Sequence, residues 1–179
     1  MTKAQKKWLA AGGAIALFLL ISNQAQAAPG DGGSVATLSY LGQSGLPKGM
    51  RNNNPGNIRV SSNAWQGKIP LSQNTDGAFE QFSTYAYGIR AMIKNLLSYY
   101  NGGLNTLQSI IYKWAPPSDN NPTSNYVNFV GIRTGFAPTQ PLDLRNQTTM
   151  RKIVMAMTEM ENGRPAVTNE QFNYAWTLV

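Results

Sequence analysis

Apolar side chains recur every three or four positions along much of this chain, a spacing that places them on one face of a helix. The pattern runs through residues 89–100, 107–114, 126–130, 150–160 and 172–176. Most of these runs end near Gly, Pro or Asn, residues that commonly terminate helices. The second half of the chain is therefore predicted to be a series of amphipathic helices.

The preceding segment, 50–82, has a different pattern. Residues 58–60 could form one short strand, and residues 78–82 alternate with a period of two, as strands do. The turn-forming sequence Asn74-Thr75-Asp76-Gly77 precedes the second run. We therefore expect a mainly α fold with a small β-region, that is, an α+β domain.

The N-terminus carries a separate apolar run. Residues 8–21 are almost wholly apolar, follow the lysine-rich residues 1–7, and precede Ala25-Gln26-Ala27, an A-x-A cleavage pattern. The run suits a signal peptide and is short for a membrane span of ~20 residues, but a retained apolar helix that anchors the chain in a membrane is the equal alternative. A buried core helix does not suit the flanking residues. Because the basic end stays in the cytoplasm, both interpretations place the domain outside it, in the periplasm or a virion membrane.

The remaining chain divides into two parts. Residues 28–47 are rich in Gly and Ser, and we expect a flexible linker there. Residues 48–179 form the predicted folded domain, an ordinary size for one hydrophobic core. The predicted organisation is thus a signal peptide or membrane anchor over 1–27, a linker over 28–47 and one domain over 48–179.

The composition limits the chemistry of this domain. The chain has no Cys and no His, which excludes disulfides, thiolate metal sites and Ser-His or Cys-His nucleophile pairs. No metal or other cofactor is expected. The net charge of +7 suits an anionic polymer or lipid, but no basic run interleaved with aromatics and no nucleic-acid motif is present, so nucleic acid is not an expected partner. Acid–base chemistry then falls mainly to 8 acidic residues.

Among these acids, Glu161 has the most distinctive predicted position. It lies four residues after Met157, on the apolar face of the helix that begins near Thr148, whereas Glu159 lies on the opposite face. A partly desolvated carboxylate near the negative end of a helix has a raised pKa. A general acid at neutral pH requires such a pKa. The alternative is that the helix frays and Glu161 is a solvated end residue.

Two residues of the expected β-region are further candidates. Glu80 follows Phe79 in the alternating segment, and it is either a site carboxylate or an exposed strand residue. Trp65 stands in a loop beside Gln66 and Gly67. An exposed Trp suits stacking on a sugar ring, whereas the alternative is a Trp that closes one end of the core.

Amide side chains are concentrated in one short stretch. The sequence Arg51-Asn52-Asn53-Asn54-Pro55-Gly56-Asn57-Ile58-Arg59 cannot form a helix or a central strand, because its Asn residues surround a Pro-Gly turn. Amides donate and accept hydrogen bonds, so they suit a polar ligand or one another. A polar surface turn is the alternative.

These motifs, in this order, resemble a known family. The Asn-rich stretch 51–59, Trp65-Gln66-Gly67, and the segments 79–82, 87–91, 114–117 and 161–163 together resemble phage and prophage proteins described as virion structural or lysozyme-like proteins. Residues 54–85 are also similar to the central part of flagellar-type glucosaminidases and lytic transglycosylases. In those enzymes a helix ending in Glu-Ser-Gly, which carries the catalytic acid, precedes this part. Here Glu161-Asn162-Gly163 looks like that element displaced to the C-terminus, which implies a circularly permuted, lysozyme-like fold.

The resemblance implies a lytic transglycosylase that acts on the glycan strand of bacterial peptidoglycan during phage entry or lysis. Glu161 would be its single general acid and base. A hydrolase would need a second carboxylate, for which Glu80 or Asp76 is the candidate. The residues expected to bind sugar or shape the loop are Arg51, Asn52, Asn53, Asn54 and Asn57, and those expected to stack on sugar are Trp65 and Tyr85. The alternative function is a non-catalytic virion or wall-binding protein on the same scaffold.

Overall fold

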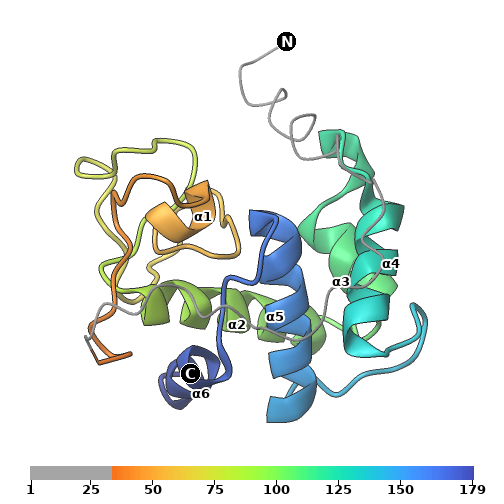
Figure 1. Ribbon diagram of the computed structural model, residues 1–179. Helices are drawn as coiled ribbons and strands as arrows, with labels where there is room; N and C mark the ends of the chain where they lie inside the picture. The colour runs from red at the N-terminus through yellow and green to blue at the C-terminus, as the bar shows by residue number, and fades with distance from the viewer. Residues whose placement is uncertain (1–33) are drawn as a thin grey trace.

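The computed structural model of the protein describes residues 34–179 (Figure 1). The predicted signal peptide or anchor over 1–27, with its apolar helix, lies outside these residues. The described helices are α1 (Lys48–Arg51), α2 (Tyr85–Asn101), α3 (Leu107–Trp114), α4 (Thr123–Thr134), α5 (Gln147–Asn162) and α6 (Asn169–Thr177), with a 3-10 turn, η2 (Pro117–Asp119), between α3 and α4. None of the helices in this part of the chain has the length and apolar character needed to cross a bilayer. The mainly α fold is confirmed for the described residues.

Helix α5 is the central element of the domain. It packs against α4 and the short α1, and it also contacts α2 and α6. Figure 1 shows α3 and α4 together on one side of α5, and α1 with the surrounding loops on the opposite side. The shared core is apolar and includes the fully buried Met92, Leu96, Ile110, Ile153 and Phe172. Because burial of such a side chain contributes about 1.5–3 kcal/mol, this core explains why the helices associate.

Side-chain caps and a left-handed glycine set the ends of these helices. The Thr168 hydroxyl accepts from the Gln171 backbone, and the Gln171 side chain accepts from the Thr168 backbone, so the two residues form a capping box at the start of α6. Thr106 and Ser109 form a similar pair before α3. Gly163 ends α5 with a φ of 68°. The chain thus leaves α5 sharply, directly after the turn that holds the predicted acid.

The predicted β-region is present only as isolated pairing. In the described chain, antiparallel bridges join Arg59 with Phe79 and Lys68 with Phe82. The two segments predicted as strands thus lie side by side at the first bridge, but neither continues as a strand. Side-chain amides supply part of the hydrogen bonding instead, because Asn54 donates to one backbone carbonyl in each segment, at 2.9 Å.

The packed part of the domain begins before Lys48, within the segment predicted as a linker. The Tyr40 ring is 3% exposed and packs edge-on against the Tyr85 ring, with the ring centroids 4.8 Å apart. The Tyr40 backbone N–H donates to the Asn53 side chain at 2.8 Å. One aromatic side chain thus anchors this Gly- and Ser-rich segment to the core.

Helix α2 approaches the Asn-rich loop closely at Gly88. A Cβ at this position would lie 1.7 Å from the carbonyl oxygen of Asn53. We predict that Gly88→Ala lowers the free energy of unfolding by about 2 kcal/mol or more, although Ala is intrinsically better than Gly in a helix. Ser98→Ala, at an exposed position of the same helix, is the matched control. Chemical denaturation measures both changes, and unchanged stability of Gly88→Ala would contradict this close packing.

Candidate functional site

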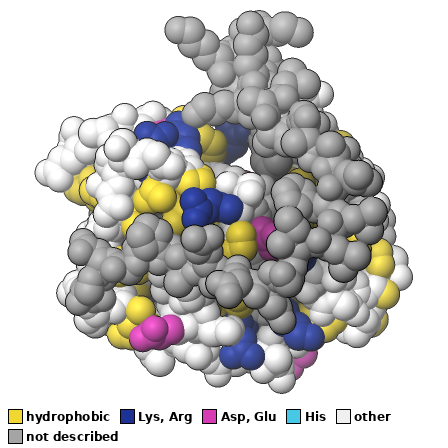
Figure 2. Space-filling model, in the orientation of Figure 1, with side chains coloured by type: hydrophobic (Ala, Val, Ile, Leu, Met, Phe, Trp, Pro, Cys, Tyr) yellow, Lys and Arg dark blue, Asp and Glu magenta, His cyan; other side chains and the backbone are white. Residues whose placement is uncertain are grey.

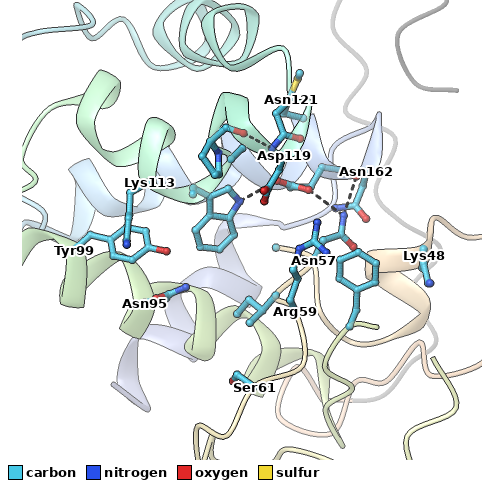
Figure 3. A pocket seen from close by; sticks show the side chains of 18 of the residues that line it. Lys48, Asn57, Arg59, Ser61, Asn95, Tyr99, Lys113, Asp119, Asn121 and Asn162 are labelled. Carbon is cyan, nitrogen blue, oxygen red and sulfur yellow. Dashed lines mark hydrogen bonds between the residues drawn. The ribbon is translucent and has the colours of Figure 1, made fainter. Parts of the chain in front are cut away.

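An open groove of about 650 Å³ lies between the loops that follow α1 and the helices α3 and α5. Figure 3 shows Asn57 and Arg59 coming from the loop side, and Lys113 and Asn121 coming from the opposite side. Polar, charged and aromatic side chains all contribute to the surface. The residues that line the groove include Asn57, Arg59, Asn63, Trp65, Phe79, Asn95, Tyr99, Lys113, Trp114, Asp119 and Glu161.

Glu161 lines this groove from the last turn of α5. The helix continues to Asn162 and then ends at the left-handed Gly163. Glu161 is therefore helical and partly buried, and the alternative of a frayed, solvated end was wrong. Glu159, predicted on the opposite face of the helix, instead forms an ion pair with Arg133 of α4 at 2.6 Å.

Three donors from three different elements hold the Glu161 carboxylate. Asn57, in the loop after α1, donates to Oε2 at 3.0 Å, and Trp114, at the end of α3, donates to Oε1 at 2.9 Å. The buried hydroxyl of Tyr126, in α4, donates to Oε1 at 3.0 Å. Since both oxygens are engaged, rotation of the carboxylate would break hydrogen bonds, and its orientation is fixed.

The surroundings of Glu161 act on its pKa in opposite directions. Desolvation by burial favours the neutral acid and is the larger effect, whereas the hydrogen bonds from Asn57, Trp114 and Tyr126 favour the carboxylate. The net result is a pKa raised above the ordinary value for Glu, as the position on the apolar face of α5 predicted. Burial, with a smaller effect of the neighbouring Glu161, raises the pKa of Tyr126 well above its usual value. The Tyr126 hydroxyl therefore stays protonated and remains a donor.

Asn57 reaches Glu161 through an unusual backbone conformation. Its φ is 50°, in the left-handed region that Asn tolerates better than most residues. Its amide donates to the carboxylate of Glu161 at 3.0 Å and to the backbone carbonyl of the same residue at 3.2 Å. The loop can approach α5 because Gly49 has no side chain: a Cβ there would lie 2.6 Å from Asn162 Oδ1 and 2.9 Å from Asn57 Oδ1. Asn57 is thus a predicted site residue that the fold does bring to the acid.

The preceding three amides of the Asn-rich loop have a structural role. Asn52, Asn53 and Asn54 are all buried. Asn52 donates to Asp76 and accepts from Gln81, both at 3.0 Å. Asn53 and Asn54 each donate to two acceptors and accept from a backbone N–H. Because these amides are satisfied within the protein and do not line the groove, they shape the loop and do not bind a ligand in this conformation.

Arg51 and Tyr85 also lie away from the groove, whereas Trp65 lines it. Arg51 is exposed at the end of α1 and is not a lining residue. The Tyr85 ring is 1% exposed, and its hydroxyl donates to the Ala166 carbonyl at 2.8 Å. A ring enclosed in the core in this way cannot stack on a sugar. Trp65 is partly exposed in the groove wall, so stacking stays a prediction for Trp65.

Glu80 is neither an exposed strand residue nor part of the groove lining. It is 0% exposed, and its Oε1 accepts from Lys68 Nζ and from the Ser61 backbone N–H, both at 2.9 Å. The geometry gives Glu80 a structural ion pair, not a place beside the acid. Asp76, the other candidate for a second carboxylate, forms an ion pair with Lys48. Within residues 34–179, no three potential metal ligands come together.

Three residues of the site carried no clear signal in the sequence. Trp114 and Tyr126 recur at helical spacing, which is typical of core positions, and in the fold they both pack on the core and donate to Glu161. Asp119 stands in a polar loop sequence, yet it lines the groove from η2. Figure 3 shows Asp119 next to Asn121, on the side of the connection between α3 and α4.

The hydrogen bond from Trp114 provides a direct test of this arrangement. Because the Trp114 N–H stabilises the ionised carboxylate, we predict that Trp114→Phe raises the pKa of Glu161 further. NMR titration of the side-chain carboxyl carbon of Glu161 measures this value without reference to any activity. Trp65→Phe is the control, since Trp65 lines the same groove but makes no hydrogen bond to Glu161 in the described structure. A downward shift in Trp114→Phe would contradict the assigned role of this donor.

Comparison with known proteins shows that the chain is similar to a phage protein. It is 37% identical over 148 residues to Protein P5 of Pseudoalteromonas phage PM2, a match that covers 76% of this chain and 89% of that protein. No family model matches the chain. Identity at this level over most of both sequences indicates common descent. The chain therefore belongs to the family of Protein P5 of Pseudoalteromonas phage PM2.

Proposed function

We propose that this protein cleaves the glycan strand of bacterial peptidoglycan as a lytic transglycosylase, with Glu161 as general acid and base. The supporting observation is the Glu161 carboxyl, which has a raised pKa, accepts from three donors and lines an open groove. Because burial raises the pKa of this carboxyl, its neutral form, which can donate a proton to a leaving group, is favoured relative to an ordinary Glu. An open groove admits a polymer that a closed pocket would exclude.

In the proposed reaction, the neutral Glu161 carboxyl donates its proton to the glycosidic oxygen, and the bond from that oxygen to the anomeric carbon breaks. The carboxylate then takes the proton of the 6-hydroxyl of the muramic sugar. The freed oxygen bonds to the anomeric carbon and forms an anhydro sugar, so Glu161 ends the cycle protonated. Trp114 and Tyr126 stabilise the carboxylate between the two steps, because both donate to its Oε1.

The groove lining suits a saccharide. Trp65, Phe79 and Tyr99 offer aromatic rings, on whose faces sugar rings can pack. Asn63 and Asn95 offer amides that both donate and accept, as sugar hydroxyls do. This mixture of apolar surface with a few polar groups is typical of sites that bind organic ligands.

The proposed scaffold is lysozyme-like with a circular permutation. The acid belongs to the C-terminal α5, while its partner Asn57 belongs to the Asn-rich loop, 104 residues earlier. We also propose that the domain works outside the cytoplasm, where peptidoglycan lies, and that residues 8–21 direct or anchor it there. Since the relative named above is a phage protein, we propose that the activity serves phage entry or lysis.

Hydrolysis is the second candidate chemistry, and Asp119 favours it. A glycosidase that uses water typically needs two carboxyl groups flanking the scissile bond. Glu80 and Asp76 are held in ion pairs and do not line the groove. Asp119 does line it and forms no ion pair within residues 34–179.

Zymography on purified cell wall tests the role of Glu161. We predict that Glu161→Gln lowers the clearing rate by about 10²- to 10⁴-fold, the usual contribution of a general acid. Glu159→Gln is the matched control, because it changes a carboxyl on the opposite face of the same helix. Full clearing by Glu161→Gln would exclude this residue as the acid. If the wild-type protein clears nothing, the non-catalytic virion or wall-binding function is favoured instead.

Mass spectrometry of the released fragments separates the two chemistries. Transglycosylation leaves an anhydro end, whereas hydrolysis leaves a reducing end that is heavier by one water. We predict anhydro ends from the wild-type protein and from Asp119→Asn, since the proposed mechanism uses one carboxyl. Reducing ends from the wild type, together with loss of activity in Asp119→Asn, would establish hydrolysis.

A further inference from the structure

Two basic side chains line the groove without an acidic partner in the described part of the chain. Arg59 and Lys113 are both exposed, and neither forms an ion pair within residues 34–179. Lys48, a third basic lining residue, differs from them because it is paired with Asp76 at 2.5 Å. Figure 2 shows basic side chains among hydrophobic and uncharged ones on one face of the molecule. Most exposed cations on a protein are solvated by water and need no other partner, but these two border the space that a substrate would fill.

Arg59 and Lys113 belong to two different elements, each of which also donates a hydrogen bond to Glu161. Lys113 directly precedes Trp114, which donates to Glu161 from α3. Arg59 follows Asn57 by two residues, and Asn57 donates to Glu161 from the loop. Figure 3 shows Arg59 and Lys113 extending from different walls of the pocket. A strand whose scissile bond lies at Glu161 would therefore meet a positive charge on each wall.

Arg59 is also positioned by an aromatic ring. Its guanidinium carbon lies 6.0 Å from the centroid of the Phe79 ring, which belongs to the same groove wall. Packing of a guanidinium on a ring uses its face and leaves the N–H donors in its plane available. Those donors match the two oxygens of a carboxylate. Arg59 can therefore contact the ring and still offer its N–H donors to a planar anion.

In a peptide-bearing peptidoglycan strand, the lactyl carboxyl of each muramic sugar is used in the amide bond to the stem peptide, so the free carboxylates belong to the peptides. On the basis of the proposed function, we propose that Arg59 and Lys113 form subsites for stem-peptide carboxylates and select glycan strands that still bear peptides. Asp119 lies on the same side of the groove as Lys113 and opposes an anion there. The contribution of Arg59 is therefore the larger of the two.

The test compares kcat/KM on glycan strands that carry stem peptides with kcat/KM on the same strands after an amidase has removed the peptides and the freed lactyl carboxylates have been converted to methylamides, so that the peptide-free strands carry no carboxylate. The wild-type protein should prefer the peptide-bearing strands. The ratio of the two values should fall about fivefold in Arg59→Gln, less in Lys113→Gln and further in the double variant, because an exposed charge pair contributes modestly. Lys94→Gln is the matched control, an exposed cation of α2 outside the groove lining, and should leave the ratio unchanged.

Three results would overturn the proposal. The first is a wild-type protein that shows no preference or favours peptide-free strands. The second is a double variant with the wild-type ratio. The third is an equal loss on both substrates, which would indicate a structural role. The wild-type preference should also decrease as salt is added, because the contacts are between exposed charges.

A binding experiment distinguishes failure of this proposal from failure of the proposed function. Full-length Glu161→Gln is titrated with peptide-bearing and peptide-free strands, with and without the substitutions at Arg59 and Lys113. If the wild-type protein cleaves neither substrate, the transglycosylase proposal fails. The titration then tests by itself whether Arg59 and Lys113 bind stem-peptide carboxylates. Weaker binding of peptide-bearing strands alone in the cation variants supports it, and equal binding of both strands in all variants overturns it.

Discussion

The carboxylate of Glu161 accepts hydrogen bonds from three elements that are far apart in the sequence: the loop after α1, the end of α3, and α4. These contacts tie the C-terminal turn of α5 to both walls of the groove. They also offset the desolvation cost of the Glu161 carboxylate, which would be strongly destabilising without hydrogen-bond donors. The three hydrogen bonds therefore fix the orientation of the acid and offset part of the effect of burial, which raises its pKa.

The Asn-rich loop illustrates how little a concentration of amides says about binding by itself. Asn52, Asn53 and Asn54 are buried, and their donors and acceptors are used within the protein. Asn57 differs because its amide donates to the carboxylate and the backbone carbonyl of Glu161 in α5. The first three residues thus build the wall, and the fourth connects that wall to the acid. The loop serves the site mainly by its shape.

The sequence predicted those features that depend on local periodicity. The helices from α2 to α6 follow from the spacing of apolar residues and from the residues that terminate each run. The same spacing along α5 was sufficient to place Glu161 on its core face. Features that depend on distant partners were not predictable in the same way. Glu80 is buried because Lys68 pairs with it, and Tyr85 is enclosed because Tyr40 returns to the core from a Gly- and Ser-rich segment.

Trp114 and Tyr126 show a further limit of sequence patterns. At helical spacing, each looks like an ordinary core residue, and each does pack on the core. Their second role appears only when the chain brings them to Glu161, across 47 and 35 residues respectively. An aromatic side chain with a polar end can pack in a core and donate a hydrogen bond in a site at the same time. Helical periodicity indicates the core packing but gives no sign of the hydrogen bond.

The raised pKa of Glu161 relates stability to the proposed chemistry. A group whose pKa is higher in the folded chain than in the unfolded chain stabilises the fold fully below the unfolded value, and this contribution is lost as the pH rises through the folded value. The fold therefore favours the neutral acid, the form that donates the first proton. After that transfer, the carboxylate lies in surroundings whose largest effect is to disfavour it, so the protein itself promotes recovery of a proton. In the proposed cycle that proton comes from the sugar hydroxyl, and the same desolvation thus assists both the acid step and the base step.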